Sequence, residues 1–164
     1  MDASLLLRTV IEPTLEWLLP EMDSPEARRM LIAIAGQESG FTSRKQIAAY
    51  KDGEPIWGPA RGWWGFEVPI IGGLKSHHAT KAAYARVMEA LEYDPETPIG
   101  QVQMILTDND LLACALARLN LRWYPHALVA DEGGAWDQYL AIWRPGKPHP
   151  HRWPGNWSMA SEVV

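Results

Sequence analysis

SPEARRMLIAIAGQESG, residues 24–40, is the stretch that decides the fold. Ser24-Pro25-Glu26 is typical of a helix N-terminus: the serine hydroxyl accepts from unpaired backbone N–H groups, proline is tolerated in the first turn, and an acidic side chain suits the positive end of the helix dipole. At the other end, Gly40 can adopt the left-handed conformation that terminates a helix. The pattern therefore predicts a helix that is capped by Ser24 and runs to Ser39.

Glu38 has an unusual place on this helix. Leu31, Ile34 and Ala35 precede it by seven, four and three residues, so the carboxylate continues an apolar stripe. Burial and the negative end of the helix dipole both disfavour the ionised form, and a buried glutamate can reach a pKa of about 6 or higher. A carboxyl that stays protonated near neutral pH can serve as a general acid. Two alternatives stay open: Glu38 turns to solvent at the helix end, or it pairs with an arginine such as Arg61.

The rest of the chain predicts further helices separated by proline and glycine, and no alternating run is long enough to require a sheet. The predicted fold class is therefore mainly α. Residues 41–78, rich in Gly, Pro and Trp, are expected to form a long loop with short elements at most, and loops of that length are usually functional. The Pro- and Trp-rich tail, 145–164, is expected to wrap the surface. The other expected helices cover Asp2 to about Leu19, Thr80–Tyr93, Pro98–Leu106, Asp110–Trp123 and a long stretch from Gly133-Gly134 to about Arg144.

Length and composition indicate one domain over residues 1–164, because 47% of the residues are hydrophobic and only 21% are charged. A net charge of −5 argues against nucleic acid as a partner. The single cysteine, Cys114, excludes an intrachain disulfide and indicates a reducing compartment.

The first 23 residues resemble neither a signal peptide nor a membrane span, so we expect cytoplasmic synthesis without a signal peptide and no membrane span. Neither a cofactor nor a metal is expected, since the paired histidines (His77-His78 and His149-x-His151) lack a metal-binding helical motif.

GPARGWWGFE, residues 58–67, combines aromatic faces, glycines and one guanidinium, which together suit a carbohydrate groove. In that groove Arg61 would bind substrate, and Trp63 and Trp64 would stack on sugar rings. The alternative, equally weighted, is that one of the adjacent tryptophans packs in the core. On the last long helix, Tyr139 lies four residues before Trp143 on one face, and either core packing or a place in the same groove fits that spacing.

Three segments resemble a known family. AIAGQESGF (33–41) followed by GPARGWWGF (58–66) looks like the Glu-Ser-x-Phe and Gly-x-x-Gly-Leu-Met-Gln pair of soluble lytic transglycosylases and goose-type lysozymes, in the lysozyme-like superfamily. AWDQYLAIWRPGKPHPHRW (135–153) resembles the C-terminal segment of short phage-encoded proteins of that superfamily. The resemblance spans about Leu31 to Trp153.

The resemblance implies a lysozyme-like multi-helix domain that cleaves the β-1,4 glycan backbone of peptidoglycan, as a lytic transglycosylase or muramidase. By position, Glu38 matches the catalytic acid and Ser39 its neighbour. Tyr139 matches, more loosely, a C-terminal tyrosine of the transglycosylases. One residue departs from the pattern: Gly65 stands where the family has glutamine. The substrate-lining loop would comprise Gly62, Trp63, Trp64 and Phe66.

Hydrolysis of a glycosidic bond usually needs a second carboxylate, about 5–9.5 Å from the acid. Lytic transglycosylases, as the resemblance implies, use one glutamate first as acid and then as base. Because the sequence offers no evident partner for Glu38, the single-carboxylate scheme is favoured. The candidates for a second carboxylate, each better explained as a surface charge, are Asp52, Glu54, Glu67 and Asp137.

A protein of another class is the alternative. Gly65 and the missing second carboxylate also allow a catalytically degenerate, lysozyme-like virion protein that binds glycan or has a structural role. The expected partners are peptidoglycan glycan strands and, as further candidates, other phage virion or tail proteins. In either case we expect a protein made in the host cytoplasm that acts at the cell wall, as a virion component or after release at lysis.

Overall fold

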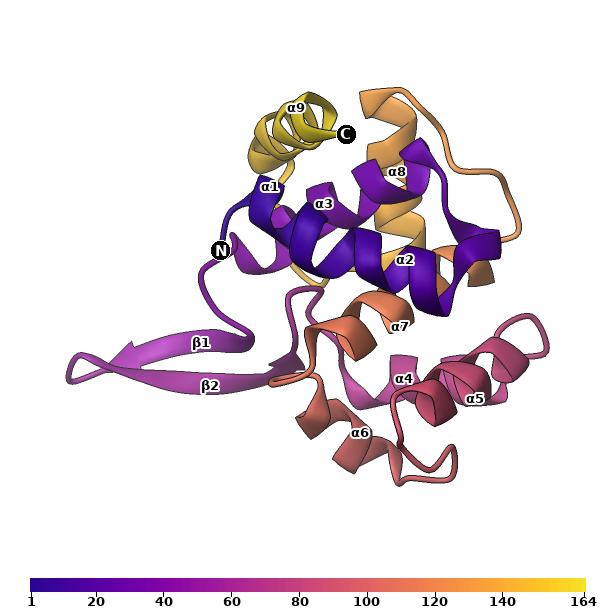
Figure 1. The fold of residues 1–164 in the computed structure, drawn as a ribbon. Helices are drawn as coiled ribbons and strands as arrows, with labels where there is room; N and C mark the ends of the chain where they lie inside the picture. The colour runs from indigo at the N-terminus through magenta and orange to yellow at the C-terminus, as the bar shows by residue number, and fades with distance from the viewer.

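Helix α3, Pro25–Ser39, forms as its sequence predicts and runs through the helical body of the molecule (Figure 1). In this computed structural model, which describes residues 1–164, Ser24 Oγ accepts a hydrogen bond from the Ala27 N–H at 3.1 Å. Gly40 ends the helix in the left-handed conformation, with φ of 56°. Every residue from Met30 to Gln37 is buried, so α3 packs against other elements on all of its sides.

Helices surround α3, and the mainly-α prediction is confirmed. The N-terminal segment is interrupted by a π-helical turn just before Pro13, which lacks an N–H group for the regular helical hydrogen bond. One core of 39 buried residues joins the elements. No helix combines the length and the apolar character that a membrane crossing needs. Within residues 1–40 and 79–144, the helices beside α3 are α1 (Ala3–Leu6), the π-helical Leu7–Ile11, α2 (Glu12–Leu18), the 3₁₀-helical Pro20–Met22, α5 (Lys81–Ala90), α6 (Ile99–Ile105), α7 (Asp110–Trp123) and α8 (Glu132–Trp143).

Residues 41–78 contain more regular structure than expected. Strands β1 (Lys45–Lys51) and β2 (Glu54–Arg61) form an antiparallel hairpin that projects from the helical body, and α4 (Val68–Ser76) follows (Figure 1). Between the strands, Asp52 and Gly53 have φ of 52° and 85°, the left-handed values that a tight hairpin turn requires. All of β1 is exposed. A strand that buries neither face needs no alternating pattern, which is why the alternation rule missed this hairpin.

The tail, residues 145–164, corrects a second expectation, because it does more than wrap the surface. Its helix α9, Trp153–Val163, packs against α3 and buries Trp153 and Trp157. Asn156 Nδ2 donates to Gln37 Oε1 at 2.9 Å. A β-carbon at Gly36 would lie 2.6 Å from Asn156 Oδ1, so only glycine allows this approach. The tail therefore belongs to the core and supports the end of α3 that carries Glu38.

Candidate active site

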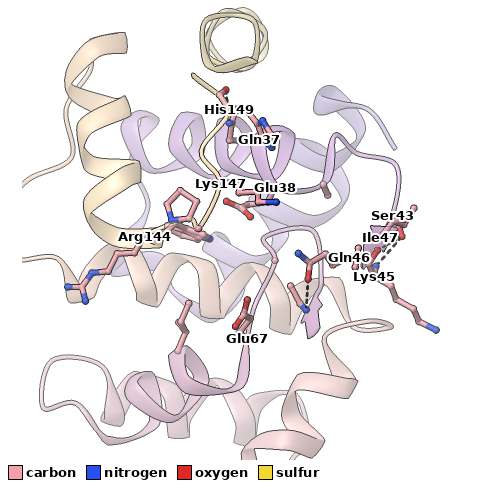
Figure 2. A pocket seen from close by; sticks show the side chains of 18 of the residues that line it. Gln37, Glu38, Ser43, Lys45, Gln46, Ile47, Glu67, Arg144, Lys147 and His149 are labelled. Carbon is pink, nitrogen blue, oxygen red and sulfur yellow. Dashed lines mark hydrogen bonds between the residues drawn. The ribbon is translucent and has the colours of Figure 1, made fainter. Parts of the chain in front are cut away.

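A cleft of about 910 Å³ opens beside the C-terminal end of α3 (Figure 2). Its walls come from the end of α3, the base of the hairpin, the start of α4, the end of α8 and the segment that leads to α9. Polar and charged side chains make up most of these walls. The cleft thus collects segments from both halves of the chain around the last turn of α3.

Glu38 lies in the wall of this cleft and is half-buried. Burial raises the pKa of Glu38 above its ordinary value of 4.5, the hydrogen bond from Tyr139 partly offsets this, and the negative charge of Glu67 adds to the increase. The net direction is the one expected from the apolar stripe. Neither alternative arrangement is present, since Glu38 is not fully exposed and Arg61 donates instead to the carbonyls of Gly58 and Ala60.

Tyr139 contacts Glu38 directly. Its hydroxyl donates to Glu38 Oε1 at 2.6 Å, across 101 positions of sequence. The phenol ring stacks on Trp153, with ring centroids 5.2 Å apart and an interplanar angle of 19°. Burial, the adjacent negative charge of Glu38 and the hydrogen bond to it all raise the pKa of Tyr139, so the hydroxyl remains a donor. Helix α8 and helix α9 together fix this donor against the carboxyl.

Gly65 faces the second oxygen of the same carboxyl. Its φ is +66°, and a β-carbon built there would lie 2.9 Å from Glu38 Oε2. Real β-carbons do not approach an oxygen so closely without displacing it. The glutamine that the family resemblance suggests at this position would therefore move Glu38. In this chain the glycine belongs to the packing around the carboxyl.

The other residues of the expected substrate-lining loop lie in the core. Trp64 and Phe66 are fully buried and Trp63 is 4% exposed. Trp64 Nε1 donates to the Leu31 carbonyl at 2.9 Å, which holds the indole under α3. Gly62 packs against α7, and Arg61 does not line the cleft. The aromatic faces are thus unavailable to stack on a sugar, which corrects the expectation for Gly62, Trp63, Trp64 and Phe66.

Ser39 lines the cleft, but its hydroxyl serves the helix end. It donates to the Ala35 carbonyl at 2.7 Å and accepts from the Phe41 N–H at 3.2 Å. Ser39 therefore shapes the chain after Glu38 and makes no hydrogen bond to the carboxyl.

Among the candidates for a second carboxylate, only Glu67 lines the cleft, on the side opposite Glu38 (Figure 2). Asp52 and Glu54 lie at the far turn of the hairpin, and Asp137 is exposed on α8 outside the cleft walls. Glu67 is exposed, as a surface charge would be, yet its charge influences the pKa of Glu38. It is thus the one candidate placed to interact with a molecule in the cleft.

Sequence reasoning missed a group of basic residues on the cleft walls, in a chain whose net charge is −5. The signal was present in the run RPGKPHPHR, residues 144–152, which supplies most of them. His77 and His78 lie elsewhere, where His77 contacts Trp123 through its ring, and no three His, Cys, Asp or Glu side chains are grouped to hold a metal ion. The basic residues of the cleft are Lys45, Arg144, Lys147 and Arg152.

Comparison with known proteins adds nothing to this geometry, because no family model, curated protein or solved structure matches the chain. The functional interpretation therefore depends on the arrangement of Glu38, Tyr139, Gly65 and Glu67 around the cleft.

Proposed function

We propose that this chain is a lysozyme-like glycosidase that cleaves the β-1,4 glycan backbone of peptidoglycan, with Glu38 as its general acid. The observation that carries the proposal is a half-buried carboxyl in the wall of an open cleft, with its pKa raised by burial and one oxygen held by Tyr139. Perturbed carboxyl groups of this kind are typical of catalytic acids. The substrate class and a site of action at the bacterial cell wall come from the family resemblance.

In the proposed reaction the neutral Glu38 carboxyl gives its proton to the glycosidic oxygen. The bond from C1 to that oxygen breaks, the bonding electrons leave with the oxygen, and positive charge develops at C1. Glu38, now a carboxylate, accepts a proton from the hydroxyl that attacks C1, which restores the acid. Tyr139 supports this second half, because a phenol hydroxyl donates most strongly to the ionised carboxylate.

The attacking hydroxyl can come from two sources. In a lytic transglycosylase it is the C6 hydroxyl of the sugar itself, and the product is an anhydro sugar. In a muramidase it is water, and Glu67 on the opposite side of the cleft would be the group to orient it. We favour the single-carboxylate scheme, since Glu67 is exposed while Glu38 alone is enclosed.

The decisive experiment compares wild-type protein with Glu38→Gln on purified peptidoglycan. Turbidity would report cleavage, and mass spectrometry of the products would separate an anhydro sugar from a hydrolysed one by the mass of one water. Removing a general acid lowers rates by about 10²–10⁴-fold, so we expect Glu38→Gln to stop clearing without lowering the melting temperature. Glu89→Gln is the matched control, because Glu89 is exposed on α5 and lies outside the cleft.

Equal and negligible activity of wild type and Glu38→Gln would reject catalysis. A pulldown with insoluble peptidoglycan would then test the remaining role in glycan binding. Protein that neither cleaves nor sediments with peptidoglycan would contradict both roles.

A further inference from the structure

Residues 144–152, RPGKPHPHR, form a basic segment in an acidic chain. Residues 138–161 contain no aspartate or glutamate, so with histidines counted as neutral that stretch carries a charge of +3 and the rest of the chain carries −8. This asymmetry indicates that one part of the surface attracts anions although the whole molecule is acidic. The basic and titratable side chains of the segment, all of them exposed, are Arg144, Lys147, His149, His151 and Arg152.

The cations of the basic segment have no acidic partner within the protein. Arg144, Lys147 and Arg152 take part in none of the ion pairs of the chain. The guanidinium of Arg144 makes one hydrogen bond, from Nε to the Ala141 carbonyl at 3.3 Å. A bound anion would therefore replace water around these groups without breaking an ion pair.

Contacts with the core hold the backbone of the basic segment in place. Trp143 and Trp153, which flank it, are 7% and 2% exposed. Three of its nine residues are prolines, which restrict the backbone, and the His149 carbonyl accepts from Gln37 Nε2 at 3.1 Å. Because the segment is already ordered, a ligand that binds to it has little further backbone entropy to remove.

The basic segment lies along the cleft that contains Glu38. Arg144, Lys147 and Arg152 line this cleft, and Lys45 at the base of the hairpin adds a fourth cation. Figure 2 shows Arg144 and Lys45 on opposite sides of Glu38. Cations thus occur along the cleft and not at a single point, an arrangement that suits a ligand whose anions are repeated along its length.

We propose that the basic segment binds a flexible polymer with one phosphodiester in each repeat, a polyol phosphate attached to the cell wall. This inference rests on the proposed function, because it places that polymer beside the glycan strand in the cleft. Arginine and lysine both bind phosphate oxygens, and regularly spaced phosphates can engage several of these cations at once. Each contact is weak at an exposed site, so their number supplies the affinity.

Two other polyanions fit the basic segment less well. Membrane-binding surfaces combine cations with exposed large apolar side chains, whereas this segment has only basic residues, prolines and one glycine. Single-stranded nucleic acid needs exposed aromatic rings on which its bases stack, and both tryptophans that flank the segment are buried. A nucleic-acid duplex is stiff and broad, so it would also meet the acidic remainder of the chain.

Sedimentation with purified cell walls tests this inference, and Glu38→Gln is used so that the walls are not cleaved. Two samples of the same walls are compared. One carries its polyol phosphate, and the other has been stripped of it by aqueous hydrofluoric acid, which breaks phosphodiesters. We expect Glu38→Gln to bind the intact walls more tightly, and we expect salt and soluble polyol phosphate each to weaken that extra binding.

Two charge-matched double variants locate the binding. Added to Glu38→Gln, the pair Lys147→Gln and Arg152→Gln should weaken binding of soluble polyol phosphate by roughly 2- to 30-fold, as the loss of two exposed ion pairs predicts. The plot of log affinity against log salt concentration should become shallower by about 1–2. Arg8→Gln with Lys81→Gln removes the same charge at exposed positions outside the cleft and should change both quantities far less. None of the four side chains forms an ion pair, so melting temperatures should be unchanged.

Equal binding of Glu38→Gln to the two wall samples, or equal loss in both double variants, would overturn the inference. Tighter binding to vesicles of anionic lipid or to DNA than to polyol phosphate, at the same salt concentration, would overturn it as well. Failure of the proposed function is distinguishable, because clearing of stripped walls by wild-type protein requires Glu38 and not the polymer. Protein that clears stripped walls, but whose Glu38→Gln form binds both samples equally, keeps the proposed function and loses this inference.

Discussion

Replacing Gly65 by alanine tests whether the carboxyl of Glu38 is held by close packing. At φ of +66° an L-residue costs about 1–2 kcal/mol, of which about 0.4–1 kcal/mol is recovered because alanine restricts the unfolded chain. The new β-carbon would also lie 2.9 Å from Glu38 Oε2 and would push the carboxyl away from Tyr139. Losing the hydrogen bond between the phenol and the neutral carboxyl costs about 0.5–1.5 kcal/mol.

The two costs add up to about 1–3 kcal/mol for Gly65→Ala, which corresponds to a melting temperature lower by roughly 2–12 °C in a chain of this size. Gly53 is the matched control, because its φ is +85° and no atom lies within 4 Å of a β-carbon there. Gly53→Ala should lose only about 1 kcal/mol, from the backbone alone.

Thermal and urea unfolding would measure the two stabilities, and clearing of peptidoglycan would measure activity. Misplacing a catalytic group by about 1 Å can cost on the order of 10²-fold in rate, so Gly65→Ala should be far less active than Gly53→Ala. Equal losses of stability in the two variants, together with full activity of Gly65→Ala, would refute the argument that this glycine makes room for the carboxyl.

Two further predictions follow from the raised pKa of Glu38. The pKa of Glu38 is higher in the folded than in the unfolded protein, so the folded state favours the protonated carboxyl. The wild type is therefore most stable below pH 4.5, the ordinary pKa of the side chain. That extra stability is lost as the pH rises through the pKa of the folded state. Glu38→Gln should therefore match the wild type at low pH and exceed it at pH 8, by about 1.4 kcal/mol for each pH unit of the pKa increase, in urea unfolding at both pH values. Glu67→Gln removes the charge that helps to raise the pKa of Glu38, so the alkaline limb of the profile of kcat/KM against pH should move to lower pH while the maximal rate is kept. Loss of activity at every pH would instead identify Glu67 as the base of a hydrolytic reaction.

The helices were predictable because their signals are local. Ser24 and Gly40 cap α3 as their residue types predict, and the apolar stripe of α3 placed Glu38 correctly beside the core. The hairpin was not predicted, since an exposed strand needs no alternation and its main signal is the two-residue turn at Asp52. Short-range patterns report helix ends and turns, but they do not report which side of a strand or loop will be covered.

The candidate site was only partly predictable for the same reason. Trp63 and Trp64 have the chemistry of a sugar platform, but both are buried, and Trp64 is held by Leu31 on α3 and by Trp143 on α8, which are distant in sequence. Tyr139 reaches Glu38 across 101 positions, and no spacing rule foresees that contact. Gly65 has no side chain to suggest a role, so its effect on Glu38 follows only from the assembled geometry.

The packing of α9 on α3 determines when, during synthesis, the surroundings of Glu38 become complete. Gln37, next to the acid, is held by Asn156, 119 positions later, and the phenol ring of Tyr139 is stacked on Trp153. A growing polypeptide on the ribosome would already display the glutamate while the helix that supports it was still inside the exit tunnel. Nascent or prematurely terminated chains without α9 would therefore carry Glu38 without the contacts that hold Gln37 and Tyr139 in place.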